Sequence, residues 1–415
     1  MRGNDSRPPF GALDGRTPGE LFGSLPTPCY VIEEKKLEEN AKLLASLTEE
    51  TGCKILLAQK AFSNYDFYPL LSSCLAGTEA SGLFEARLGA EEMPDGEVHV
   101  FCAAYREEEM DELLRYADHV VFNSPGQLRR FGPMAKAAGR QVGLRINPQC
   151  STQEGHAIYD PCAQGSRLGT TLQVWKEQMS EELVELLDGL HFHTLCEQDA
   201  DALETTLAAV EESFGAFLSR MKWLNMGGGH HITKPGYDLE KLKKCIKYAQ
   251  DKWKLQVYLE PGEAVALNSG YLVTRILDIV ENSGVRIAII DASAACHMPD
   301  VIEMPYTPPL YGALPWEEKE ETAPFAIQEK NGAVYRLAGP TCLAGDVVGD
   351  YLFPGELQIG DLLVFGDMAI YTTCKNNTFN GMPLPDLWRR TPEGEAVRLT
   401  AFGYEAFKGR LGSRQ

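Results

Sequence analysis

The sequence lacks the patterns that mark secreted, membrane-spanning or disulfide-rich proteins. None of its eleven cysteines belongs to a C-x-x-C pair, and no apolar run reaches the roughly 18 residues that a transmembrane helix needs. The first two dozen residues contain no continuous apolar stretch, so we expect no secretion signal. These absences predict a cytoplasmic protein with reduced thiols.

Nucleotide and zinc motifs are missing as well. The chain has no G-x-x-x-x-G-K-[ST] loop and no G-x-G-x-x-G after a strand. His191 with His193, and His230 with His231, have no cysteine at ligand spacing, so we expect no bound metal. The formal charge of −20 disfavours nucleic acid and anionic membrane surfaces as partners, and it suits a cationic substrate.

The length indicates two structural units, because 415 residues exceed the size at which one hydrophobic core usually stops growing. Hydrophobic residues make up 44% and charged residues 24% of the chain, which are ordinary values for a globular protein.

Short apolar runs separated by helical stretches follow one another between residues 50 and 262. Strands that alternate with helices are typical of parallel βα units, and eight such units in about 210 residues predict a (β/α)8 barrel. The eight runs are Lys54–Gln59, Glu79–Gly82, Glu97–Ala103, His119–Asn123, Gln141–Asn147, Gly189–Thr194, Met221–Met226 and Leu255–Glu260.

Two of the intervening helices can be read directly. Asp199–Ser219 carries apolar residues at helical spacing, which predicts a helix with one face on the barrel. Ser124 followed by Pro125 reads as an N-cap and a first turn.

After residue 270 the sequence pattern changes to short β-rich segments separated by Gly, Pro and Asp. We expect an N-terminal extension at 1–26, a barrel at 27–270 whose first strand joins the β domain, and a mostly β domain at 271–415. Thr307–Thr322, rich in Pro and Glu, reads as an exposed loop. The β-rich segments are 271–280, 286–294, 333–339, 361–366 and 369–374.

Reactive residues gather where the predicted strands end, which is where barrels of this type place their chemistry. Lys60 follows the first strand, and an amine desolvated there could lose its proton and attack an aldehyde. His193 and Glu260 end the sixth and eighth strands, and Gly227, Gly228 and Gly229 follow the seventh. Asn147 ends the fifth.

Each of these residues also has a simpler interpretation. Lys60 could extend to water from a strand end, and His193 could be a hydrogen-bonded core histidine. The glycines could form a tight turn, and Glu260 could cap a helix.

Together, the residues supply what pyridoxal phosphate needs. A glycine loop lets backbone N–H groups approach a phosphate, Glu260 can keep the pyridine nitrogen protonated, and His193 can stack on the ring. We therefore expect pyridoxal 5'-phosphate as the cofactor.

The motifs themselves point to a known family. The chain resembles the fold type III pyridoxal phosphate decarboxylases, which include ornithine and diaminopimelate decarboxylases, from residue 27 to about 408. The matching segments are TPCYVIE, LLAQKAF, HFHTLCE, NMGGG, EPGEA, GPTCLAGD and AIYTTCKNNTFNG.

The resemblance implies roles for individual positions. Lys60 is similar to the lysine that carries the cofactor, His193 to the stacking histidine, Gly227–Gly229 to the phosphate loop and Glu260 to the pyridinium partner. Tyr371 resembles a phosphate-binding tyrosine and Arg167 a basic residue near the cofactor. Cys342 resembles the cysteine that a second subunit contributes to handle a proton, so a homodimer with active sites at the interface is implied.

Two departures from the family pattern bear on the substrate. Diaminopimelate decarboxylases carry arginine where this chain has Glu263, and a carboxylate there attracts an amine. Ornithine-type enzymes carry aspartate where this chain has Leu343.

The segment Asp291–Tyr306 resembles the carboxynorspermidine/carboxyspermidine decarboxylases, whose substrate is a long triamine with one carboxylate. The resemblance makes Glu263 and Asp300 candidate ligands for its amino groups, although Asp300 could instead cap a helix or turn. One methylene separates the two substrates, so the sequence does not choose between them.

Three alternatives remain open. The chain could act on diaminopimelate, ornithine or arginine, although Glu263 and Leu343 disfavour the first two. A catalytically inactive homologue would be expected to lack Lys60 or Cys342. A racemase of the same fold would not be expected to carry the GPTC motif.

Overall fold

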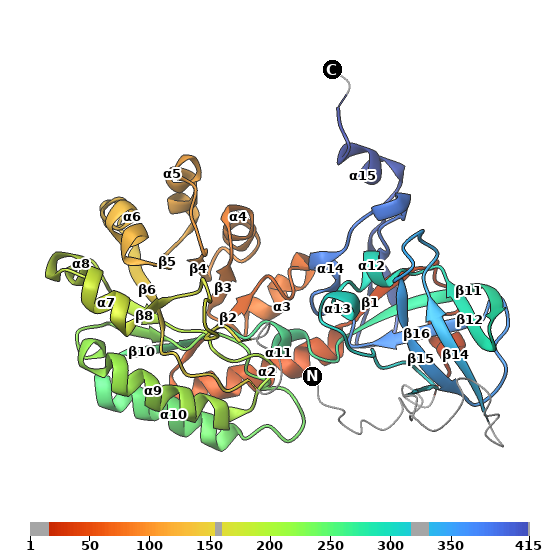
Figure 1. Cartoon of the computed structure of the whole chain (residues 1–415), viewed down its shortest axis with the longest axis horizontal. Coiled ribbons are helices and arrows are strands. Elements are labelled where there is room, and N and C mark those ends of the chain that lie inside the picture. Colours follow the sequence, from red (N-terminus) through yellow and green to blue (C-terminus); the bar gives the residue numbers. More distant parts are fainter. Residues whose placement is uncertain (1–15, 154–159, 317–331, 414–415) are drawn as a thin grey trace. The chain divides into compact units, whose positions relative to one another are not determined.

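A computed structural model describes residues 16–153, 160–316 and 332–413 of the chain. The chain divides into two compact units, each with its own sheet (Figure 1). Residues 38–265 form one unit. Residues 1–37 and 266–415 form the other, so the boundaries differ from the expected 27–270 and 271–415 by about ten and five residues.

The first unit is a closed parallel barrel, as predicted. Hydrogen bonding runs in the order β5-β4-β3-β2-β10-β9-β8-β6, and β5 pairs with β6 to close the ring. A two-residue strand, β7 (Thr170–Thr171), pairs with the end of β6. The eight barrel strands are β2 (Lys54–Ala58), β3 (Gly77–Ala80), β4 (Glu97–Phe101), β5 (His119–Phe122), β6 (Gln141–Asn147), β8 (Gly189–His191), β9 (Trp223–Asn225) and β10 (Gln256–Leu259).

Helices connect these strands. The helix predicted from residue 199 is α9 (Ala200–Leu218), which begins with the side chain of Asp199 as its N-cap. Ser124 caps α6 (Pro125–Ala137), also as predicted. The others are α2 (Glu34–Thr51), η1 (Tyr65–Phe67), α3 (Tyr68–Ser72), α4 (Leu83–Glu92), α5 (Glu107–Tyr116), α7 (Leu172–Gln178), α8 (Glu181–Glu185), α10 (Leu239–Trp253) and α11 (Glu263–Ala266).

Trp223 packs inside the barrel against Leu56, Val121 and Tyr258. Two glycines make room for its indole ring: a Cβ on Gly189 would lie 2.0 Å from the ring, and one on Gly143 would lie 2.4 Å from it. A side chain at either glycine would therefore displace the indole that fills this layer.

The second unit is a mostly antiparallel sheet with the strand order β13-β15-β14-β12-β11-β1-β17-β18, and β16 pairs with β11. β1 pairs antiparallel with β11, so the first strand of the chain belongs to this unit. The strands are β1 (Cys29–Glu33), β11 (Gly270–Asn282), β12 (Val285–Ile290), β13 (Leu314–Pro315), β14 (Ala333–Ala338), β15 (Val347–Phe353), β16 (Leu362–Gly366), β17 (Asp386–Arg390) and β18 (Ala396–Thr400).

Residues close to the N-terminus take part in this unit. The helix α1 (Pro18–Phe22) begins with a capping box between Thr17 and Glu20. Phe22 and Leu25 then pack with the core of the sheet, so residues 17–26 are part of the unit and not a separate extension. The remaining short helices are α12 (Ala294–His297), α13 (Asp300–Glu303), α14 (Thr372–Lys375), η3 (Phe379–Gly381) and α15 (Tyr404–Gly409).

The structure differs from two local predictions. Residues 369–374 do not form a strand: α14 begins at Thr372, and Tyr371 before it has a left-handed φ of 60°. Within the expected loop 307–322, β13 forms at Leu314–Pro315, and residues 317–322 lie outside the described part. None of the helices that the structure describes is long and apolar enough to cross a membrane.

Candidate active site at the carboxyl ends of the barrel strands

Lys60 lies two residues beyond the end of β2. The side chain of Gln59 is buried, and its amide donates to the carbonyl oxygen of Glu85 over 2.8 Å. The hydroxyl of Tyr68 donates to Oε1 of Gln59 over 2.9 Å. Both ends of the Gln59 side-chain amide are therefore hydrogen-bonded, which fixes the residue that precedes Lys60. The side chain of Lys60 itself is exposed, so the expectation that its amine is desolvated at the strand end is wrong for this chain.

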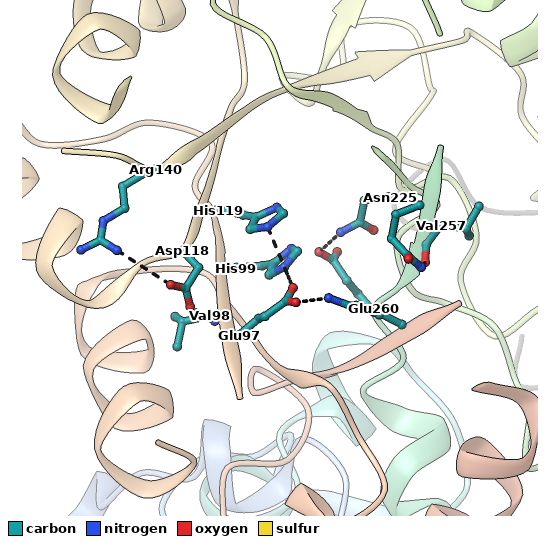
Figure 2. Close-up of polar contacts among 11 residues, drawn as sticks. Glu97, Val98, His99, Asp118, His119, Arg140, Asn225, Val257 and Glu260 are labelled. Carbon is teal, nitrogen blue, oxygen red and sulfur yellow. Dashed lines mark hydrogen bonds and ion pairs between the residues drawn. The ribbon is translucent and has the colours of Figure 1, made fainter. Parts of the chain in front are cut away.

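Glu260 follows β10 and is a buried carboxylate with two fixed partners. Oε2 lies 3.1 Å from Nε2 of His191. Oε1 accepts a hydrogen bond from the amide of Asn225 over 2.5 Å (Figure 2). Burial alone would raise the pKa of Glu260, but His191, His99 and Lys60 together outweigh it and lower the pKa to about 2. Glu260 is therefore ionised at neutral pH.

His193 lies two residues beyond β8, and its ring is oriented by the glycine loop. The N–H of Gly228 donates to Nδ1 of His193 over 3.1 Å, which places the ring proton on Nε2. Burial lowers the pKa of His193 well below its ordinary value, and the positive charges of Lys60 and Arg145 lower it further. A neutral, flat imidazole is thus fixed beside the loop.

The three loop glycines are required by packing. A Cβ on Gly227 would lie 2.4 Å from the carbonyl oxygen of Phe192, and one on Gly229 would lie 2.0 Å from that of Leu195. Both have positive φ, 70° and 82°, which favours glycine.

The N–H groups of this loop are not all available to a ligand. That of Gly227 donates to Oδ1 of Asn225 over 2.9 Å, and that of Gly228 donates to His193. Among the described residues, only the N–H of Gly229 within this trio is left uncommitted. The loop therefore offers a phosphate fewer donors than the sequence suggests.

Sequence reasoning missed Glu79, which lies in β3. Its side chain is 3% exposed, and Oε2 has no hydrogen-bond partner within the described ranges. Burial raises the pKa of Glu79 to about 8. The charge of Lys60 lowers this pKa, and the charge of Glu260 raises it. Glu79 is therefore protonated at neutral pH. The sequence does contain a sign of this residue: Glu79 lies inside a short apolar strand, and a carboxyl group is rarely buried there unless it is paired.

Arg145, also missed, is a buried cation on β6. Its guanidinium donates to the carbonyl oxygen of His193 over 3.0 Å and lies 4.6 Å from the centroid of the Phe101 ring. Burial lowers the pKa of Arg145 to about 10, and it remains charged. Arg167, the basic residue that the resemblance places near the cofactor, is exposed, and its carbonyl oxygen accepts a hydrogen bond from the amide of Asn123 over 2.8 Å.

Glu263 begins α11 and lies next to a histidine. Nε2 of His231 is 3.2 Å from Oε1 of Glu263, an ion-pair distance without the alignment of a hydrogen bond. Glu197 offers a third ligand atom to this cluster. The carboxylate proposed from the sequence to bind an amine thus already has one basic neighbour.

Cys342 belongs to the sheet unit, in the turn between β14 and β15. Its side chain is exposed, and its N–H donates to Oδ1 of Asn380 over 2.9 Å. Thr341 donates to the buried carboxylate of Asp346 over 2.7 Å, which holds the turn closed. The GPTCLAGD and TFNG motifs therefore meet in space.

Asp300 lies in the same unit and is paired. The ammonium of Lys375 contacts Oδ1 of Asp300 and lies 2.6 Å from Oε2 of Glu303. Asp300 is the first residue of α13. This position agrees with the other interpretation of Asp300 from the sequence, a carboxylate at the end of a helix. Tyr371 immediately precedes the helix α14 that carries Lys375.

The donor set of the barrel unit fits pyridoxal phosphate. An ionised carboxylate, a neutral imidazole of fixed tautomer and a lysine stand at the ends of three strands, and the Gly229 N–H is uncommitted. These groups would hold the pyridine nitrogen, one ring face, the aldehyde carbon and the phosphate, respectively.

Comparison with known proteins agrees with this fit. Residues 29–369 match the family model described as pyridoxal-dependent decarboxylase, C-terminal sheet domain. A carboxynorspermidine/carboxyspermidine decarboxylase from Campylobacter jejuni is 42% identical, over 93% of this chain and 99% of the relative. A carboxyaminopropylagmatine decarboxylase from Synechocystis is 40% identical, over 94% and 97%. The crystal structure of the Campylobacter jejuni carboxynorspermidine decarboxylase complexed with norspermidine has a TM-score of 0.83, over 92% of this chain and 99% of that one.

Proposed function

Because this chain belongs to the pyridoxal-dependent decarboxylases, we propose that it converts carboxynorspermidine and carboxyspermidine to norspermidine and spermidine in polyamine biosynthesis. The observation that carries the substrate assignment is the 42% identity, over almost both full lengths, to a relative named for this reaction.

The barrel residues prepare the chemistry. Pyridoxal phosphate, when bound, supplies an electron sink for the pair released as carbon dioxide leaves. Lys60 would anchor the cofactor, and Glu260 would hold a negative charge at the pyridine nitrogen. His191 and Asn225 orient that charge, and His193 supports one face of the ring. Arg167 and Tyr371 are proposed from the resemblance to lie near the cofactor, with Tyr371 at its phosphate.

Charge also supports the substrate assignment. A carboxylated triamine is cationic at several nitrogens, and Glu263 and Asp300 would bind these ammonium groups. Each carboxylate has a basic neighbour, so substrate binding would displace His231 from Glu263 and Lys375 from Asp300.

We further propose that Cys342 donates a proton to the carbon that has lost carbon dioxide. As the resemblance implies, this cysteine would act from the second subunit of a homodimer. The exposed apolar side chains of Leu343 and Phe379, beside Cys342 and Asn380, support a contact surface there. The eleven cysteines are all free, which supports a reducing, cytoplasmic location.

One further substrate has a specific observation in its favour. The carboxyaminopropylagmatine decarboxylase is 40% identical, nearly the same as the first relative, so carboxyaminopropylagmatine is the second candidate.

A substrate panel tests the assignment. Carboxynorspermidine, carboxyspermidine, carboxyaminopropylagmatine, diaminopimelate, ornithine and arginine are each incubated with the holoenzyme, and carbon dioxide and the amine product are measured. We expect the first two to have the highest kcat/KM, and to differ from each other by no more than about 200-fold, since one methylene separates them. A higher kcat/KM for any other member would overturn the assignment.

A further inference from the structure

The opposite end of the barrel contains a cluster that the proposed function does not use. Glu97 is the first residue of β4, and His99 follows two positions later. His119, the first residue of β5, pairs in register with His99. Strand alternation and this register bring the three side chains together, as Figure 2 shows. Because Glu97 and His119 begin their strands, the cluster lies toward the amino-terminal end. Lys60, His193 and Glu260 lie at the carboxyl end.

The ligand atoms of the cluster converge. Oε2 of Glu97 is 3.0 Å from Nε2 of His99 and 3.9 Å from Nε2 of His119, and one ligand atom from each residue lies within 4.8 Å of the others. The two imidazole rings are stacked, with centroids 3.8 Å apart. Tyr258 and Trp223 flank them, so the site has an aromatic wall.

Both imidazoles have an unsatisfied nitrogen, because Nδ1 of His99 and Nδ1 of His119 are buried without a hydrogen-bond partner in the described parts of the chain. His119 is 6% exposed. Its Nε2 is too far from Glu97 for a hydrogen bond. The nitrogen of His119 that faces Glu97 is Nε2. Burying an imidazole that makes no hydrogen bond is unfavourable, so an ion bound at Nε2 would offset part of that cost.

Lys54 orients the carboxylate without occupying all of it. Its ammonium contacts Oε1 of Glu97, which leaves Oε2 directed at the two histidines. An outer partner that fixes a ligating carboxylate is usual around protein-bound metals. Lys54 and Glu97 are both partly exposed, which gives an ion a route from solvent.

We propose that Glu97, His99 and His119 bind a first-row divalent cation such as Zn²⁺. Two imidazole nitrogens and one carboxylate oxygen are a common donor set for these ions, with bonds of about 2.0 to 2.2 Å. Binding requires His119 to move toward Oε2 and the ring stack to open, because both nitrogen lone pairs must point at one ion. The ion would link β4 to β5 at the amino-terminal end of the barrel, the end that contributes to stability and not to catalysis.

Sequence reasoning could not find this site. It considered only histidines close together in the chain, whereas His99 and His119 are brought together by strand pairing. The site does not depend on the proposed function.

Titration of chelator-treated holoenzyme with Co²⁺ tests the proposal, since bound Co²⁺ absorbs in the visible and thiolate ligands add distinct charge-transfer bands. We expect one equivalent bound without thiolate bands, and a rise in Tm with Zn²⁺. Glu97→Gln and His119→Phe should each weaken binding by about tenfold or more, whereas Lys54→Met should retain or strengthen it.

Two control variants locate the ion. Glu181→Gln removes the same charge from an exposed pair with Arg220 and should leave binding unchanged. Glu197→Gln alters the other histidine–carboxylate cluster, with His231 and Glu263. Absence of binding, insensitivity to Glu97→Gln, or loss only with Glu197→Gln would each overturn the proposal.

Discussion

The carboxylate of Glu260 and the imidazole of His191 form a buried pair whose closest atoms, Oε2 and Nε2, are 3.1 Å apart. Burial lowers the pKa of His191, against the raising effect of Glu260. Glu260, whose pKa is lowered to about 2, keeps a negative charge at the position proposed for the pyridine nitrogen.

Glu260→Gln removes this charge while nearly preserving the side-chain shape. We expect kcat to fall by about 10² to 10³-fold, because the electrostatic support acts where charge develops. The control is Asn225→Ala, which removes one hydrogen bond to Oε1 but keeps the charge, and should lower kcat less. Equal losses in the two variants would show that orientation, and not charge, is what matters.

Lys60→Ala should abolish both turnover and the visible absorbance of the lysine-bound cofactor, because no other amine would anchor the aldehyde. Lys54→Met is the matched control, since Lys54 begins the strand that Lys60 follows. It should keep the absorbance and the carbon dioxide release. Retained turnover in Lys60→Ala would rule out the anchoring role.

The sequence revealed this part of the site because its residues stand where apolar runs end. Lys60, His193 and Glu260 each follow a strand that local patterning predicts, and barrel topology then places them at one end. Glu79, Arg145 and the pairing of His191 with Glu260 escaped notice, because they depend on contacts between strands far apart in the chain.

The error at residues 369–374 has a different cause. Tyr and Thr residues favour strands, but the backbone turns into α14 at Tyr371, whose φ is 60°. Tertiary packing overrides local preference there. Similarly, β3 begins at Gly77 and not at Glu79, because Gly77 and Thr78 pair with β4 despite their weak apolar character.

Glu79 should make stability depend on pH. The folded chain keeps a proton on Glu79 up to about pH 8, whereas an ordinary glutamate releases it near 4.5, so the free energy of unfolding falls as pH rises across this interval. Glu79→Gln cannot ionise. Its stability relative to the native chain, measured by urea unfolding, should therefore increase from about pH 4.5 to 8 and then level off.

The control for this measurement is Glu109→Gln, which changes an exposed pair with Arg106 and should give a nearly flat difference. A flat difference for Glu79→Gln would mean that Glu79 is already ionised in the folded chain.

Glu263→Gln should raise KM for carboxynorspermidine by about tenfold, with little change in kcat or cofactor content, because a charge-assisted hydrogen bond to an ammonium is lost. Glu263→Arg should raise KM further through charge reversal. His231 would remain beside either substituted residue. An unchanged KM in both variants would remove Glu263 from the substrate pocket.

Mixing two inactive variants tests whether Cys342 acts across a subunit interface. Lys60→Ala lacks the anchor of the barrel unit, and Cys342→Ala lacks the thiol of the sheet unit, so each alone should be nearly inactive. If sites are shared between subunits, random pairing makes half of the dimers mixed, and each mixed dimer carries one intact site. Activity should then recover to about a quarter of the wild-type value, with a dimeric mass in light scattering. No recovery after verified subunit exchange would show that each chain completes its own site.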